Sequence, residues 1–110
     1  MVIRQGDIIK FNFNPKKGHE QAGYRPAVVI SNETFNTNTD LLIVLPVAGS
    51  NNEFPLHVPL DDRTTTDGYI MCEHPKSIDR IARDVSKVES LPRDILKKII
   101  GITKAEISIE

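Results

Sequence analysis

Apolar and polar residues alternate over much of the first two thirds of the chain, and this pattern predicts β-strands. In the first of them Ile9, Phe11 and Phe13 share one side while Ile8 and Lys10 share the other, which is typical of a half-buried strand. The later runs are short, apolar and β-branched, or alternate, as core strands do. The expected strands cover residues 7–13, 26–31, 41–47, 56–60 and 68–73. Polar, turn-forming segments separate them, at 14–24, 32–40, 48–53 and 61–67.

The last third of the chain has a helical period. Residues 78–88 fit one helix, but a helical turn at 77–82 followed by a strand at 83–88 fits equally well. Ser90 is expected to cap a C-terminal helix with Pro92 in its first turn. The apolar stripe of that helix is expected at Ile95 or Leu96, Ile99, Ile100 and Ile107. Five or six short strands and a terminal helix predict a mainly β, α+β fold, a small and partly open antiparallel barrel.

Length and composition narrow the class of protein. The 110 residues fit a single domain, 1–110, and 39% hydrophobic with 26% charged residues is typical of a soluble globular domain. No apolar run reaches the ~20 residues of a membrane helix, and no secretion signal is recognisable. The one cysteine excludes an internal disulfide, so the cytoplasm is expected. A net charge of -1 argues against a bulk nucleic-acid binder but leaves room for a local positive groove.

Arg25 is a candidate for binding an anion. Pro26 restricts it to an extended backbone, at the mouth of the expected strand, beside a polar loop that carries His19, Glu20 and Gln21. A guanidinium is a planar, permanently charged fork that suits a phosphate. The alternative is a solvated arginine in a surface ion pair with Glu20.

The other histidines and the cysteine suggest no metal site. Cys72 and His74 alternate to one face of a strand, but two ligands are too few, and Cys72 fits a small core residue. His57 lies between apolar neighbours, so we expect it to face solvent.

RNA cleavage needs neither a metal nor a protein nucleophile, because the 2′-hydroxyl can attack the adjacent phosphorus. The protein must then supply a base, an acid and a cation. Arg25, His19 and Glu73 have this chemistry, but the residues alone leave ribonuclease activity a hypothesis.

A longer sequence pattern supports the ribonuclease hypothesis. Residues 18–26 read Gly-His-Glu-Gln-x-Gly-x-Arg-Pro and continue into an apolar strand, after Gly-Asp-Ile at 6–8. This pattern resembles the N-terminal signature of the MazF/PemK toxins. The likeness continues through Pro46-Val47, Gly68-Tyr69-Ile70 and residues 75–79, so it covers nearly the whole chain.

The resemblance implies an SH3-like barrel, shared with the CcdB gyrase poisons, and a homodimer with an RNA groove at the subunit interface. It implies a type II toxin that cuts single-stranded mRNA without metal or cofactor and leaves 2′,3′-cyclic phosphate and 5′-hydroxyl ends. The protein partner would be an antitoxin whose disordered C-terminal segment folds over the same groove. It implies no membrane partner.

Position by position, the resemblance assigns Arg25 as the catalytic arginine, with His19 and Glu73 beside it, and places Ala48 where the family has a catalytic threonine. In the PemK branch an arginine and an aspartate stand where this chain has Met71 and Glu73, so it follows the MazF branch in relying on Arg25. The positions expected to contact RNA are Glu20, Gln21, Gly49, Ser50, Leu56, Tyr69 and Met71.

Ala48 is the main departure from the family pattern. Ser50 could supply the missing hydroxyl from a shifted loop, the chain could be an inactivated variant, or it could be a natural homologue that binds without cutting. Losing a positioned catalytic group costs ~10²–10⁴ in rate, so weak or no nuclease activity is expected. The alternative function is a non-catalytic protein-binding module, like the gyrase poisons, although the chain lacks their terminal aromatic residue.

Overall fold

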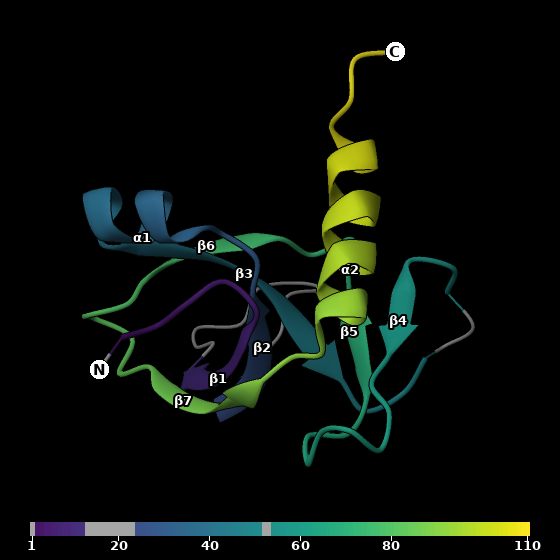
Figure 1. Cartoon of the computed structure of the whole chain (residues 1–110), viewed down its shortest axis with the longest axis horizontal. Helices are drawn as coiled ribbons and strands as arrows, with labels where there is room; N and C mark the ends of the chain where they lie inside the picture. The colour runs from purple at the N-terminus through teal and green to yellow at the C-terminus, as the bar shows by residue number, and fades with distance from the viewer. Residues whose placement is uncertain (1, 13–23, 52–53) are drawn as a thin grey trace.

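The structure is a computed structural model, and it describes residues 2–12, 24–51 and 54–110 (Figure 1). Antiparallel strands form an open sheet, with a short helix at one end and a long helix standing on one face. The elements are β1 (Asp7–Asn12), β2 (Tyr24–Val29), α1 (Glu33–Thr39), β3 (Leu41–Ala48), β4 (His57–Pro59), β5 (Tyr69–Met71), β6 (Lys76–Asp79), β7 (Ser86–Ser90) and α2 (Arg93–Glu106).

The seven strands follow the order β4-β5-β3-β2-β1-β7, and β6 pairs with β3 beside this path. β3 is the longest strand and joins two parts of the sheet. Its first half pairs with β6, its middle with β2, and its last two residues, Val47 and Ala48, with β5. β4 lies at the edge, as Pro59 predicted. The partly open antiparallel barrel is thus confirmed, and the described residues form seven strands rather than five or six, with two helices.

Two hydrophobic clusters lie on opposite faces of the central strands. Successive residues of β1 alternate between them: Ile8 packs in the cluster beneath α2, with Ile95 and Ile99, and Ile9 packs in the other, with Phe11. The predicted half-buried strand is therefore confirmed at Lys10 and Asn12, which are exposed, but Ile8 on the same side is buried. The terminal helix covers Ile8, and a single strand's pattern does not report what packs above it.

A helix lies where the sequence predicted only a polar turn. α1 begins after Asn32, whose side chain accepts a hydrogen bond from the Phe35 backbone N–H at 2.9 Å, and it ends at Asp40 with φ 57°. Its residues, Glu-Thr-Phe-Asn-Thr-Asn-Thr, have weak helix propensity. The capping residues and the buried Asn36 position this helix, and neither gives an apolar period.

Residues 77–82 contain no helix. β6 ends at Asp79, whose carboxylate accepts the backbone N–H groups of Ile81 and Ala82 and closes a turn into β7. Both helical interpretations are wrong there, although the strand in the second one overlaps β7. Ile81, which completed the apparent helical period, is 74% exposed.

The C-terminal helix is confirmed, but its ends differ from the prediction. Ser90 is the last residue of β7 and not a cap, because α2 starts at Arg93, after Pro92, and has no side-chain cap. Ile95, Leu96 and Ile99 are buried as predicted, whereas Ile107 is 79% exposed beyond the body of the protein (Figure 1). No helix among the described residues is long and apolar enough to cross a membrane.

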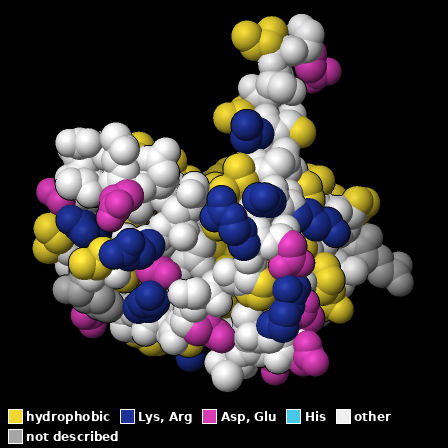
Figure 2. All heavy atoms as spheres, viewed as in Figure 1, with side chains coloured by type: hydrophobic (Ala, Val, Ile, Leu, Met, Phe, Trp, Pro, Cys, Tyr) yellow, Lys and Arg dark blue, Asp and Glu magenta, His cyan; other side chains and the backbone are white. Residues whose placement is uncertain are grey.

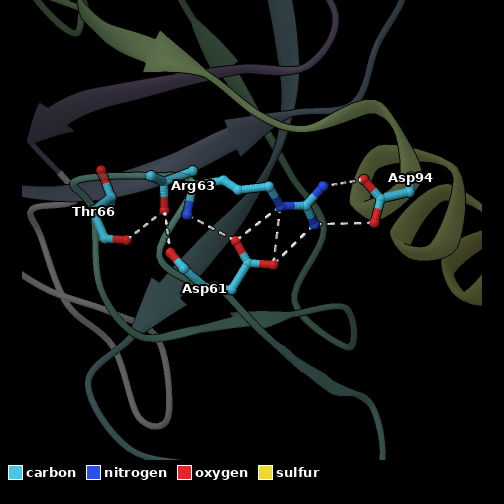
Figure 3. A network of polar contacts seen from close by, with 5 residues as sticks. Asp61, Arg63, Thr66 and Asp94 are labelled. Atoms are coloured by element: carbon cyan, nitrogen blue, oxygen red, sulfur yellow. Dashed lines mark hydrogen bonds and ion pairs between the residues drawn. The ribbon is translucent and has the colours of Figure 1, made fainter.

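Polar contacts fasten the 61–67 connector to the base of α2 (Figure 3). The Arg63 guanidinium donates hydrogen bonds to the carboxylates of Asp61 and Asp94, the latter in the first turn of α2. The Glu89 carboxylate of β7 accepts hydrogen bonds from the backbone and hydroxyl groups of Thr65 and Thr66. This connector leads directly into β5, so these contacts also fix the start of that strand.

Candidate nucleic-acid interface

Arg25 is the second residue of β2 and is exposed. The prediction that it precedes the strand is wrong, because β1 extends to Asn12 and its pairing holds Arg25 opposite Phe11. Three other predicted residues, His19, Glu20 and Gln21, lie outside the described part of the chain, so their positions stay predictions.

Strand register brings Arg25 and Ala48 to the same end and the same face of the sheet. Ala27 of β2 pairs with Pro46 of β3, and the strands are antiparallel. Arg25 and Ala48 each lie two residues beyond that pair, in the same direction. Side chains two residues apart share a face, so these two point to one side.

The same face continues over β5 and β4. Ala48 pairs with Tyr69, and Met71 pairs with His57. The intervening Ile70 belongs to the cluster beneath α2. Residues directly opposite in a ladder share a face. We call the side that bears Arg25, Ala48, Tyr69, Met71 and His57 the site face, and it is turned away from α2.

The predicted RNA-contact positions differ in their exposure and in the side of the sheet on which they lie. Gly49 and Ser50 are exposed directly after β3, and Tyr69 is half-buried. Met71 is only 4% exposed, so little of it is available to a ligand in the single chain. Leu56 packs against the cluster beneath α2 and thus belongs to the opposite side of the sheet.

Glu73 is held by His57. Its Oε2 lies 2.7 Å from His57 Nε2, and its Oε1 is buried without a hydrogen-bond partner. The expectation that His57 faces solvent is wrong, since its side chain is 5% exposed. Alternation placed it opposite the helix-covered face, but Glu73 and the segment after β3 close over it. No signal along the sequence revealed this contact, because the partners come from three separate segments.

Cys72 is a core residue, as predicted, and is fully buried. Burial, followed by the nearby carboxylates of Glu106 and Glu73, raises the pKa of its thiol to about 12. It therefore stays protonated and unreactive at neutral pH. Among the described residues, no group of three or more His, Cys, Asp and Glu side chains could hold a metal ion.

A second group of positively charged side chains lies along α2, on the other side of the sheet from the site face. Figure 2 shows lysine and arginine side chains over the base of the terminal helix. Arg93, Lys97 and Lys104 line a hollow of about 240 Å³ there, together with Gln5. The net charge of -1 thus conceals a local basic surface that the composition alone did not predict.

Known proteins resemble the whole chain. The family described as "PemK-like, MazF-like toxin of type II toxin-antitoxin system" matches residues 4–101. The Escherichia coli endoribonuclease toxin MazF is 35% identical over 108 residues, 98% of this chain and 93% of that protein. The Escherichia coli endoribonuclease PemK is 33% identical over 105 residues, 90% of this chain and 77% of that protein.

Solved structures agree with the sequence matches. The crystal structure of MazF from Deinococcus radiodurans superposes with a TM-score of 0.92 at 29% identity, covering 99% of both chains. A MazE-MazF crystal structure from the same organism gives 0.87 at 29% identity, covering 100% of this chain and 99% of that one. By sequence and by fold, the chain belongs to the PemK-like, MazF-like family of toxins of type II toxin-antitoxin systems.

Proposed function

We propose that this chain is an endoribonuclease toxin that binds single-stranded RNA across the site face. The observation that carries the proposal is the convergence of Arg25 with Ala48 at one end of β2 and β3, on the side of the sheet opposite α2. An exposed guanidinium there can grip a scissile phosphate. Relatives that are named endoribonucleases align over nearly the whole chain.

The chemistry follows from that placement. The ribose 2′-hydroxyl attacks the neighbouring phosphorus, Arg25 stabilises the charge on the pentacoordinate phosphorane, and the 5′-oxygen leaves with a proton, which gives a 2′,3′-cyclic phosphate and a 5′-hydroxyl. No metal or cofactor takes part in these steps. Glu73 is a poor general base in the observed arrangement, because His57 holds one oxygen and the other is buried. The base falls instead to His19.

Ala48 makes the reaction slow. Its methyl group can neither donate nor accept a hydrogen bond at the place where the family has a hydroxyl. Ser50 is exposed two residues further on, beyond the end of β3, and so does not occupy the position of the family's hydroxyl. We expect Ala48→Thr to raise the cleavage rate by ~10²–10⁴.

The working form is a cytoplasmic homodimer, and an antitoxin covers its RNA groove. Two of the similar structures are complexes of MazF with MazE, as their names state. An antitoxin segment that orders on this face would compete with RNA for Arg25.

The test measures RNA affinity and end chemistry for the parent, Ala48→Thr, Arg25→Ala and the combined variant, with EDTA present. We expect EDTA-insensitive cleavage in Ala48→Thr, with cyclic phosphate ends, and loss of cleavage when Arg25→Ala is added. Arg80→Ala is the matched control, because Arg80 pairs with Asp40 at the far end of β3. If both the parent and Ala48→Thr leave the RNA intact, the proposed endoribonuclease activity is refuted. Equal RNA affinity for the parent and Arg25→Ala would refute the proposal that Arg25 binds the scissile phosphate.

A non-catalytic binding protein is the second candidate, and Ala48 is the observation that favours it. It predicts that RNA or antitoxin binds in an Arg25-dependent manner while Ala48→Thr still fails to cut. The same titrations therefore separate the two functions.

A further inference from the structure

His57 makes two short hydrogen bonds inside the protein, one from each ring nitrogen. Nδ1 lies 2.6 Å from the Asn51 carbonyl oxygen, and Nε2 lies 2.7 Å from Glu73 Oε2. The ring of Phe54 meets the imidazole edge-on, with centroids 5.2 Å apart and planes at 88°. A buried side chain held from three directions has a fixed orientation.

The partner of Nδ1 fixes the direction of one of these bonds. A backbone carbonyl has no hydrogen to donate, so Nδ1 carries a proton and donates it to Asn51. Nε2 and Glu73 Oε2 share the second hydrogen bond, which orients the ring from its other side. The other titratable groups nearby are His74, whose Nε2 is 3.8 Å from the same Glu73 oxygen, and Glu106, which the charge of Glu73 affects.

The hydrogen bond to Asn51 links His57 to the segment that follows Ala48, which the proposed function places at the RNA site. Asn51 follows Ala48, Gly49 and Ser50 at the end of β3. Its carbonyl also accepts the Phe54 backbone N–H at 3.2 Å, and the Phe54 carbonyl accepts the His57 backbone N–H at 3.0 Å. Asn51 is thus linked to Phe54 directly and, through the His57 ring, to β4 and Glu73.

We propose that His57 is a positioning residue: its Nδ1–H hydrogen bond clamps the backbone at Asn51 and so holds Ala48–Ser50 in place for RNA, while Glu73 contacts the other ring nitrogen. This inference rests on the proposed function and deepens it. It also gives Glu73 a supporting role in place of the catalytic one that the sequence suggested. Neither side chain needs to touch RNA for the clamp to act.

Two substitutions separate the two bonds. The amide nitrogen of Asn is as many bonds from Cβ as His Nδ1, and that of Gln is as many bonds away as His Nε2. His57→Asn therefore keeps a donor for the Asn51 carbonyl and loses the contact to Glu73. His57→Gln keeps a donor for Glu73 and loses the contact to Asn51. His74→Gln is the matched control, since His74 is 37% exposed and makes no bond to Asn51.

RNA affinity is measured for all variants and for Arg25→Ala at one salt concentration. We expect His57→Gln to weaken binding ~10-fold, as for loss of a hydrogen bond, while His57→Asn and His74→Gln stay within about 3-fold of the parent. Equal affinities for the two His57 variants, whether both high or both low, or a weaker His57→Asn, would overturn the proposal.

A second measurement needs no RNA. In NMR spectra of the free protein, the amide signals of Gly49 and Ser50 should move in His57→Gln but not in His57→Asn. Unmoved amide signals in His57→Gln overturn the clamp even if RNA binds. If the NMR results hold but no variant binds RNA in an Arg25-dependent manner, the proposed function fails and the loop clamp stands.

Discussion

Gly68 offers a sharp test of the packing behind the site face. It lies just before β5 with φ 125°, a backbone conformation that residues with a side chain rarely adopt. A Cβ at this position would lie 2.3 Å from the Ala48 carbonyl oxygen and 3.0 Å from Val47 Cγ1. The close approach lets β5 pair with the end of β3, so the glycine supports the strand that carries Ala48.

The expected cost of Gly68→Ala follows from these two effects. A residue with a side chain in such a backbone conformation costs ~1–3 kcal/mol, and forcing a methyl group against packed backbone costs a further ~1–3 kcal/mol. The free energy of unfolding should therefore fall by about 2–6 kcal/mol, against a total of about 5–15 kcal/mol for a typical domain. The melting temperature should fall by roughly 10–40 °C.

Urea unfolding at one protein concentration measures the change, because the apparent stability of an oligomer depends on concentration. Gly101→Ala is the matched control. Gly101 lies in α2 with open space around it, so this substitution should stabilise the protein by ~0.5–1 kcal/mol. A loss below about 1 kcal/mol for Gly68→Ala, with Gly101→Ala behaving as expected, would refute the close packing of Gly68 on Ala48.

Three further predictions test other parts of the fold. Cys72 should resist thiol reagents at about pH 8 until urea unfolds the protein, because burial raises the pKa of its thiol to about 12; rapid labelling of folded protein would contradict this. Burial disfavours ionised Glu89, but hydrogen bonds from Thr65 and Thr66 outweigh it and lower the pKa of this carboxyl. Its contribution to stability is therefore present above its unfolded pKa of about 4.3 and lost as pH falls through the folded value, so the urea midpoints of the parent and Glu89→Gln should converge in acid. Asn32→Ala should lower the free energy of unfolding by ~0.5–2 kcal/mol, because the cap of α1 is lost; an unchanged midpoint would argue against that cap.

The sequence correctly predicted the elements whose apolar residues recur with one clear period. The strand over residues 41–47 and the stripe of Ile95, Leu96 and Ile99 were found because apolar residues recur there with a clear period. The helix expected within 77–88 failed for the opposite reason. Ile78 and Ile81 are correctly spaced for a helix, but pairing with β3 makes the first residue part of a strand and leaves the second in a turn.

The site was predictable only in part. Arg25 could be identified because it matches a long family pattern, and Ala48 because it departs from that pattern. The strand register then showed that both lie on one face of the sheet. The contact of His57 with Glu73 and Asn51 could not be predicted, because it joins residues from separate segments that no periodicity relates. The sequence indicated Glu73 as a candidate carboxylate but could not show that His57 already contacts it.

The division of β3 between two parts of the sheet limits how such a protein can change. Pro46 pairs with β2, while its neighbour Val47 pairs with β5. An insertion or deletion of one residue within β3 would exchange the residues that face the two hydrophobic clusters and would displace Ala48 from its partner. Changes in length should therefore be tolerated in connectors such as 61–67, while β3 keeps a constant number of residues and varies only by substitution.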